Sequence, residues 1–210
     1  MVGMSGLNSP KTRLIKSQLD WEIIIMETTK YNVVFQGLRP LMFDRYAGDN
    51  NTKLPTEEKM YLSKDRHLIM PALNVMSLLC AENTKSVARQ FFGKNGKTIA
   101  LGIASYCNIE PFEIPIYDGK NNPIIFGGWN EKVYIHKSVA RLAKGIPNPK
   151  QRPTIALPWE IAFTVEYTKN DYCTLENLRQ ALATGGVLGL GTFRPFFGRY
   201  ELVTFEESNK

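Results

Sequence analysis

The chain has 210 residues, of which 43% are hydrophobic and 22% are charged, and its formal net charge is +6. This length is sufficient for a buried core, and no apolar run approaches the roughly 20 residues that a bilayer-spanning helix needs. Three isolated cysteines (Cys80, Cys107 and Cys173) and two histidines exclude a disulfide framework, a zinc knuckle and a His-rich metal site. We therefore expect a cytoplasmic protein with no metal, no cofactor and no membrane partner.

The N-terminal residues differ from the rest of the chain. Met1–Lys16 shows no clean hydrophobic period, which is typical of a poorly ordered terminus. Trp21–Met26 back-translates to a purine-rich GGGAR shortly before an ATG, a pattern similar to a bacterial ribosome-binding site before a start codon. We expect residues 1–25 to be a disordered or mis-started extension and 26–210 to form a single domain. The alternative is a real N-terminal arm that packs or swaps.

The first half of the folded chain predicts a strand, an irregular excursion, a hairpin, one long helix and two short strands. The strand rests on alternating apolar residues that stop at Gly37. The helix rests on Pro71 in its first turn and on Leu73, Met76 and Phe91 at helical spacing. The predicted elements are a strand at Tyr31–Gln36, the excursion at Leu38–Asn51, a hairpin of Lys59–Leu62 with His67–Met70, a helix from Pro71 to Gly93, and strands at Ile109–Tyr117 and Ile124–Phe126.

The second half predicts strand, loop, strand, helix, glycine-rich loop and strand. Trp159–Tyr167 alternates most clearly, and Thr174 caps a helix whose apolar stripe contains Leu178 and Leu182. The predicted elements are strands at Lys132–Arg141, Trp159–Tyr167 and Arg199–Phe205, with loops at Gly145–Pro153, which holds three prolines, and at Gly185–Gly198. Two β-α-β halves with inserted hairpins and loops predict an α+β fold, a ferredoxin-like sandwich similar to an RNA-recognition motif.

The positive charge is segregated along the sequence. Residues 84–109 carry +4, residues 128–158 carry +5 and residues 185–200 carry +2, so the remaining chain carries −5. A surface that binds a polyanion needs such clustering, because neutralised phosphates and released counterions supply most of the non-specific affinity. The alternative is a set of solvated loops that never meet in space.

One predicted strand combines basic and aromatic residues. Alternation places Lys132, Tyr134, His136 and Ser138 on one face of Lys132–Arg141, with Lys137 and Arg141 nearby. Such a face suits single-strand binding, and Lys150 and Arg152 in the following loop are candidates for a clamp. The alternative is an edge strand that its lysines protect against aggregation.

The glycine-rich segment Gly185–Gly198 joins the last helix to the last strand. Its glycines allow positive φ and close approach to a ligand, and its backbone N–H groups could cradle a phosphate. We therefore count Gly189, Gly191, Arg194 and Arg199 among the candidate binding residues, with Phe193, Phe196 and Phe197 as stacking faces or as packing under the loop. The alternative is a structural helix cap followed by a tight turn.

Gly189-x-Gly191 followed by Gly198 and the final strand resembles the glycine-rich loop of the RAMP superfamily, the RNA-binding proteins of CRISPR antiviral systems. The run from Gly189 to Arg199 is also similar to the C-terminus of uncharacterised phage and prophage proteins. The resemblance covers the last quarter of the chain. It implies a ferredoxin-like fold, a loop that contacts the nucleic-acid backbone, and a bacterial, archaeal or phage-infected cell.

The leading hypothesis is a non-enzymatic binder of single-stranded nucleic acid, RNA before DNA, that lines a guide or coats a strand in a CRISPR-like or phage ribonucleoprotein. Its partners would be the strand and other subunits or copies of itself. The second hypothesis is a metal-independent endoribonuclease, with His136 as the weak catalytic candidate and His67 as its only possible imidazole partner. The third is a phage or mobile-element assembly protein whose basic surface binds a protein.

Overall fold

Two antiparallel sheets organise the molecule, which we describe from a computed structural model. The structure describes residues 27–49, 51–82, 85–141 and 147–208, so the expectations for residues 1–25 and Met26 lie outside it. The larger sheet has the order β3-β5-β8-β1-β9, and β4 also pairs with β8. Its strands are β1 (Thr28–Gly37), β3 (Ile69–Pro71), β4 (Cys107–Glu110), β5 (Glu113–Tyr117), β8 (Glu160–Thr168) and β9 (Tyr200–Glu207).

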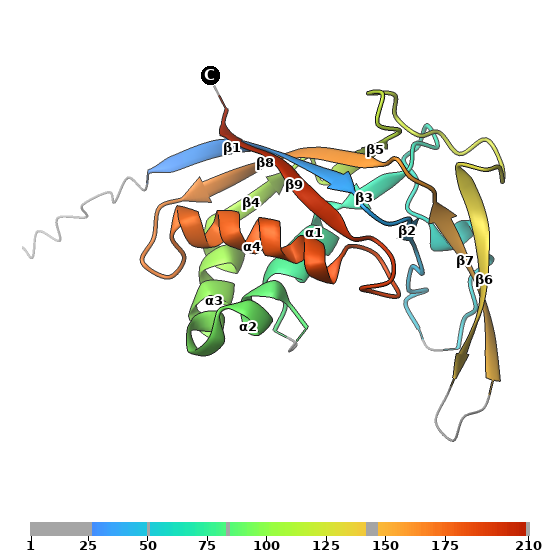
Figure 1. Cartoon of the computed structure of the whole chain (residues 1–210), viewed down its shortest axis with the longest axis horizontal. Helices are drawn as coiled ribbons and strands as arrows, with labels where there is room; N and C mark the ends of the chain where they lie inside the picture. Colours follow the sequence, from blue (N-terminus) through green and yellow to red (C-terminus); the bar gives the residue numbers. More distant parts are fainter. Residues whose placement is uncertain (1–26, 50, 83–84, 142–146, 209–210) are drawn as a thin grey trace, which may run out of the picture.

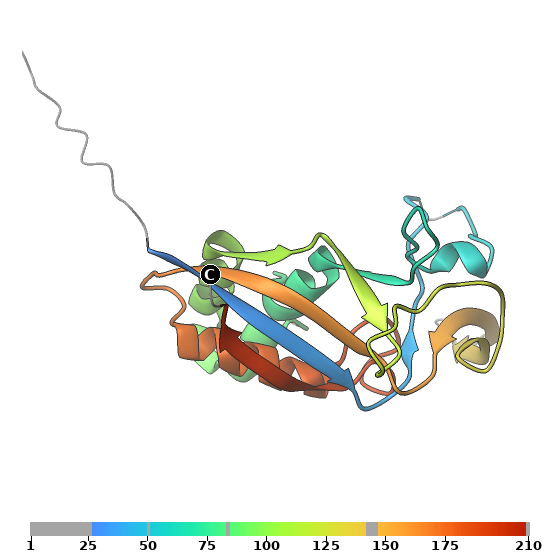
Figure 2. The ribbon, with the colours of Figure 1, turned by 90° about the horizontal axis from the view of Figure 1, so that it is seen from above.

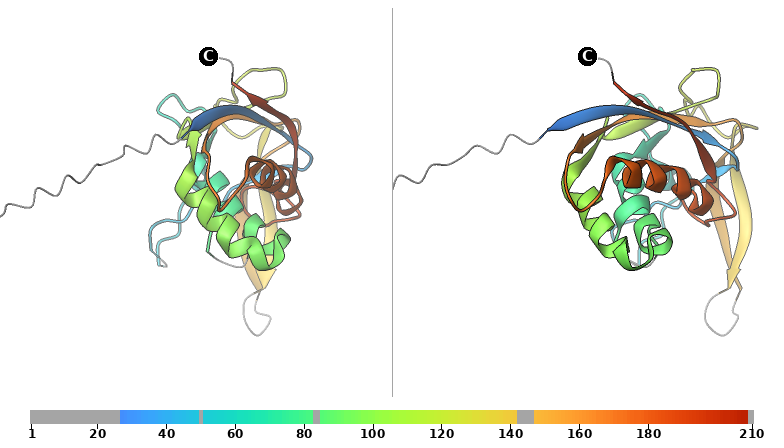
Figure 3. Two further views of the ribbon diagram at one scale, coloured as in Figure 1. Left: turned by 90° about the vertical axis from the view of Figure 1, so that its left-hand side faces the viewer. Right: turned by 60° about the vertical axis from the view of Figure 1, so that its left-hand side comes forward.

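The helices lie together on one face of the larger sheet, as Figures 1 and 3 show. In Figure 2, seen from above, no helix of the described chain covers the opposite face of β1, β8 and β9. None of the described helices is long and apolar enough to cross a membrane. The helices are α1 (Ala72–Cys80), α2 (Val87–Phe91), α3 (Gly96–Tyr106) and α4 (Leu175–Leu188), with short 3-10 turns η1 (Glu57–Lys59) and η2 (Gly93–Asn95).

The core forms between β8 and α4 as the sequence predicts. Alternate residues of β8 are buried, and so is Trp159 just before it, because one face of the strand lies under the helices. In α4, Leu178 and Leu182 are buried, and the Thr174 side chain accepts a hydrogen bond from the Asn177 N–H at 3.2 Å. The predicted strand, helix and N-cap are therefore confirmed.

The second sheet has the order β2-β7-β6 and projects from the body as a long hairpin (Figure 1). Its strands are β2 (Leu41–Met42), β6 (Val133–Arg141) and β7 (Pro147–Ile155). The prediction of a loop up to Pro153 is therefore wrong from Pro147 onward; Gly145 and Ile146 lie outside the described residues. The prediction of strand β6 is confirmed.

The three prolines of β7 fit the strand because their backbone nitrogens all face the same edge of it. Pro147, Pro149 and Pro153 are spaced by even numbers and pair with Arg141, Val139 and Ile135 of β6. The Pro153 carbonyl accepts the Phe43 N–H at 3.0 Å, so this backbone edge faces away from β6. The missing N–H groups therefore all fall on the edge that β6 does not use, where proline is tolerated.

The helix predicted from Pro71 to Gly93 is two helices, because the backbone turns out of the helical conformation at Ala81, where α1 ends. Leu73 and Phe91, which the prediction places on the apolar stripe, are both exposed. Helix α3 is missed by the prediction, although Ile99, Ala100 and Ile103 form its buried face. In place of the predicted hairpin before Pro71, the structure has an isolated β-bridge between Leu62 and Leu68, followed by the short strand β3.

The predicted Gly185–Gly198 loop begins later than expected, because α4 continues to Leu188. Gly185 and Gly186 belong to the helix, where β9 crosses it closely. A Cβ on Gly186 would lie 2.0 Å from the Tyr200 carbonyl oxygen, so only glycine permits this approach. The observed class is α+β with antiparallel sheets, which confirms the prediction at that level.

Phe163→Ala will destabilise the protein by about 3–5 kcal/mol, because the ring is buried and packs edge-to-face on Phe35 at 5.1 Å. Urea denaturation measures the change. Thr164→Ala, on the outward face of the same strand, is the control and will shift stability by less than about 0.5 kcal/mol. Equal effects of the two substitutions would show that the facing of β8 is misassigned.

The cysteines will react slowly with iodoacetamide in the native state at pH 8. Burial disfavours the thiolate and raises the pKa of Cys80 to about 11, of Cys107 to about 12 and of Cys173 to about 11. The reactive form is therefore scarce until the pH approaches these values or the protein unfolds. Mass spectrometry will show fast labelling only in urea; labelling at the rate of a free thiol without urea would contradict this burial.

Candidate nucleic-acid interface

The open face of the larger sheet is acidic. The open-face residues of β8 alternate with its buried residues, and their partners on β1, β9 and β4 include no aromatic residue. Tyr117 of β5, opposite Glu160, also lies on this face. Lys30 is held by Glu166 at 2.9 Å and by Glu110 at 3.3 Å, and these hydrogen bonds raise its pKa. Against this one lysine the face presents Glu110, Glu160, Glu166, Glu201 and Glu206. Recognition on an open sheet requires aromatic and basic groups, so a polyanion is disfavoured here.

The hairpin brings the predicted basic residues into register. Tyr134, His136 and Ser138 of β6 stand opposite Thr154, Arg152 and Lys150 of β7 and so share one face with them. Lys137 pairs with Gln151 and belongs to the opposite face, where it is exposed. The backbone of Arg141 pairs with Pro147, but its side chain lies outside the described part of the structure.

The glycine-rich loop is fastened to the connection between β1 and β2 through its backbone. Thr192 N–H donates to the Met42 carbonyl at 2.9 Å, and Gly198 N–H donates to the Pro40 carbonyl at 2.8 Å. Gly189 ends α4 with a φ of +81°, and its N–H and that of Leu190 also donate within the protein. The sequence suggests that these N–H groups cradle a phosphate, but in the structure they donate to carbonyls of the protein instead.

Gly191 sits where this attachment is tightest. Its φ is +73°, and a Cβ at this position would lie 2.3 Å from the Met42 carbonyl oxygen. Both constraints exclude other residues without a shift of the backbone. The glycine therefore serves the docking of the loop onto β2.

Aromatic side chains of the loop meet the hairpin. The rings of Phe197 and His136 lie 5.1 Å apart, and the Arg152 guanidinium lies 5.6 Å from the centre of the Phe193 ring. Phe193 is 43% exposed and Phe196 is 72% exposed, so part of each ring is accessible to a ligand. We call this region the loop–hairpin surface, made of Tyr134, His136, Lys150, Arg152, Phe193, Arg194, Phe196 and Phe197.

Arg152 is an internal cation of this surface. It is only 7% exposed, and its Nε donates to the Asp44 carboxylate at 2.8 Å. The Lys59 Nζ lies 3.7 Å from the same carboxylate and donates to the Gln151 carbonyl. Asp44 therefore links β7 to the segment after β2. Its carboxylate also neutralises part of the positive charge that the sequence predicts to contact phosphate.

Two further candidates lie away from the loop–hairpin surface. The Lys132 Nζ donates to the carbonyl oxygens of Ala156 and Pro158, and burial lowers its pKa. Arg199 lines a different groove with Glu176 and Arg179, beside α4 and β9. Arg194 stays with its own loop, where its Nη1 donates to the Gly189 carbonyl at 3.3 Å, and Arg199 lies in this other groove.

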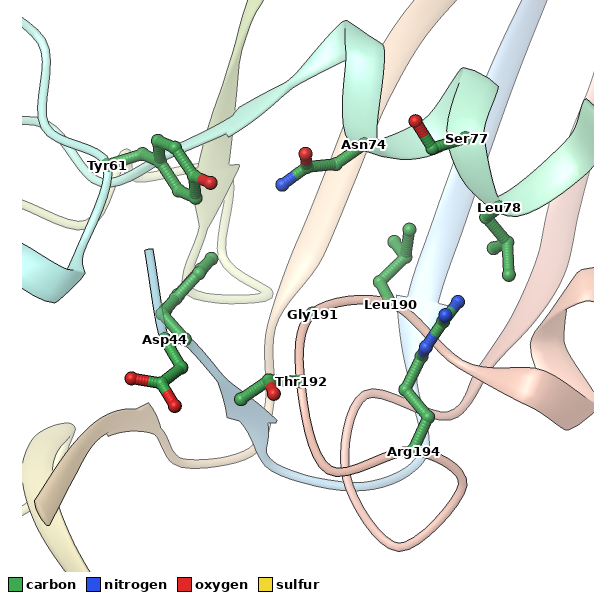
Figure 4. Close-up of a pocket in the computed structure, with 10 residues that line it drawn as sticks. Asp44, Tyr61, Asn74, Ser77, Leu78, Leu190, Gly191, Thr192 and Arg194 are labelled. Atoms are coloured by element: carbon green, nitrogen blue, oxygen red, sulfur yellow. The ribbon is translucent and has the colours of Figure 1, made fainter. Parts of the chain in front are cut away.

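Two cavities flank the glycine-rich loop, and Gly191, Thr192 and Arg194 line both. The first, of about 270 Å³, we call the loop pocket; Figure 4 shows it between α1 and the loop. The second, of about 520 Å³, is lined also by Lys85, Gln90 and Phe193. The loop pocket is lined by Phe43, Asp44, Tyr61, Asn74, Ser77, Leu78, Leu190, Gly191, Thr192 and Arg194.

The two histidines lie on different elements. His67 pairs with Ile125, whereas His136 lies in β6 against Phe197, and within the described residues the two imidazoles do not contact each other. Among the side chains that the structure describes, no group of three or more His, Cys, Asp or Glu is arranged to hold a metal ion.

No protein-family model and no curated protein sequence matches the chain. Among solved structures, it is similar to a chain in the cryo-EM structure of the Type III-B Cmr-beta bound to cognate target RNA. The TM-score is 0.57 at 14% sequence identity, and the match covers 86% of this chain and 61% of that chain. The chain thus shares the fold of part of a longer protein.

Gly191→Ala will lower stability by more than about 1 kcal/mol and displace the loop, because the new methyl group meets the Met42 carbonyl at a positive φ. Thermal unfolding measures the loss. Gly127→Ala is the matched control, since no atom lies within 4 Å of its Cβ position and its φ is not positive. An unchanged melting temperature for Gly191→Ala would contradict the close docking of the loop.

Proposed function

We propose that this chain binds single-stranded nucleic acid, RNA in preference to DNA, along the loop–hairpin surface, and that it acts as a binding protein and not as an enzyme. The observation that carries the proposal is the junction of loop and hairpin, where Phe193 and Phe197 contact Arg152 and His136 and where Phe193 and Phe196 are exposed. The acidic open sheet offers no competing site for a polyanion.

The topology supports a ferredoxin-like fold of the RAMP type. Strands β9-β1-β8-β4 are neighbours in that order, and all their pairs are antiparallel. Helices α1–α3 connect β1 to β4, and α4 connects β8 to β9, which makes two β-α-β units. The resemblance of the glycine-rich loop to the RAMP superfamily and the likeness to a chain of an RNA-bound Cmr-beta support RNA as the polymer.

This combination favours a subunit that lines a guide or coats a strand in a CRISPR-like or phage ribonucleoprotein. The ribonuclease alternative gains nothing from the geometry, since His136 lies against a phenylalanine ring and has no acid–base partner in the described residues.

Aromatic stacking and positive charge make separate contributions to the proposed binding. Phe193 and Phe196 offer ring faces to bases, and each stacked base contributes about 1–3 kcal/mol. Arg194 and Lys150 would contact phosphates from the loop and from the hairpin. Lys132 and Arg152 are held by acceptors of the protein, and Arg199 lies in a different groove, so we omit all three from the phosphate contacts.

Arg194→Ala will weaken binding and flatten the dependence of log K on log salt by about 0.7, the contribution of one phosphate on a single strand. Phe196→Ala will cost about 1–3 kcal/mol of affinity and leave the slope unchanged. Fluorescence anisotropy with a labelled single-stranded RNA, titrated at several salt concentrations, measures both.

Arg199→Ala is the matched control, because it removes the same charge from a groove that shares no lining residue with the loop cavities. A loss equal to that of Arg194→Ala would contradict the location of the site. Undetectable binding of RNA and DNA at low salt would overturn the proposal and favour the assembly-protein reading. Cleavage of the RNA without added metal would favour the ribonuclease.

A further inference from the structure

We infer that the loop pocket binds the base of one unstacked nucleotide of the strand and selects adenine. The inference rests on the proposed function and adds sequence preference to it. The pocket opens beside Arg194, a lining residue that it shares with the second cavity, so a strand whose phosphate lies at Arg194 can turn one base inward.

Polar groups converge on the pocket without partners in the described protein. Figure 4 shows the Tyr61 hydroxyl and the Asn74 amide turned toward the cavity. Within the described residues, the hydroxyl groups of Tyr61, Ser77 and Thr192 make no side-chain hydrogen bond. A concave site with apolar walls and a few convergent polar groups is the usual form of a small-ligand pocket.

Asn74 is the group that can read a base. Its amide nitrogen reaches only the Met70 sulfur at 3.8 Å, a weak acceptor, and its amide oxygen has no partner among the described residues. A carboxamide can donate to N7 and accept from N6 of adenine at the same time. Adenine would thus satisfy both ends of Asn74, while Leu78 and Leu190 provide apolar walls.

The acidic group of the pocket does not oppose this ligand. The Asp44 carboxylate is bound by Arg152 at 2.8 Å and lies 3.7 Å from Lys59, so its charge is already compensated. Figure 4 shows this carboxylate turned away from Tyr61 and Asn74. Guanine presents two acceptors, N7 and O6, on the edge where adenine presents N7 and N6, so the Asn74 amide oxygen would find no donor there.

The test compares single-stranded RNA 12-mers of adenine, cytosine and uracil by fluorescence anisotropy. We expect wild type to bind the adenine 12-mer at least about fivefold more tightly, the lower end expected for a bidentate contact. Asn74→Ala will lose affinity for the adenine 12-mer alone, so that most of the preference disappears. Any preference that remains reports stacking on the phenylalanines, which the substitution leaves in place.

Two variants keep the result interpretable. Tyr61→Phe removes only a hydroxyl and will reduce the preference without loss of fold, which thermal unfolding verifies. Asn108→Ala removes an asparagine from the acidic sheet face and will leave the preference unchanged. If Asn74→Ala folds poorly, Tyr61→Phe decides the outcome.

The outcomes separate the two proposals. Failure of wild type to bind any 12-mer overturns the proposed function, and this inference with it. Binding that Asn74→Ala and Tyr61→Phe weaken equally for all three polymers, or not at all, overturns the inference alone. Adenosine monophosphate tests whether the pocket binds a free nucleotide. If Asn74→Ala weakens its binding while the 12-mers show no base preference, the pocket binds a free nucleotide and the inference is wrong.

Discussion

The attachment of the glycine-rich loop to the β1–β2 connection is the constraint on which the rest of the arrangement depends. Pro40 and Met42 accept backbone hydrogen bonds from Gly198 and Thr192, and Leu41 and Met42 form the strand that pairs with β7. The loop that ends α4 and the hairpin that projects from the body are thus fixed to the same short segment. Phe193 and Phe197 can meet Arg152 and His136 only because of this shared anchor.

The ion pair between Asp44 and Arg152 adds a second link at the same place. Because Arg152 is buried, removal of Asp44 would leave its charge without a compensating carboxylate at the base of the hairpin. The consequence for binding is that part of the positive charge near the loop is internal. Under the proposed function, affinity for a strand would therefore rely more on the exposed phenylalanines than the number of basic residues in the sequence suggests.

Local patterns in the sequence predict local structure well here. The alternation of β8 and the capped stripe of α4 lead to the observed elements, because each buries one regular face in the core. The prolines of β7 mislead because their tolerance depends on which edge β6 uses, a property of the pairing. The long helix fails because Leu73 and Phe91 are apolar but exposed.

The candidate site is predictable only in part, because its geometry is non-local. The hairpin face and the glycine-rich loop are each recognisable by composition. The segment that joins them, Leu41–Met42, consists of two apolar residues and gives no indication of a functional role. The sequence predicts a helix at Asn74, a hairpin at Tyr61 and an irregular excursion at Asp44, and none of the three is marked as a site residue. Their convergence depends on how α1 and the loop pack against β2.

The most direct measurement is ultraviolet cross-linking of the full chain to a uridine-containing single-stranded RNA, followed by mass spectrometry of the linked peptides. If the loop–hairpin surface holds the strand, the cross-links will fall on the peptide with Phe193, Phe196 and Phe197 and on that with Tyr134 and His136. Cross-links on Phe112 or Tyr117, beside the acidic open sheet, would contradict the account.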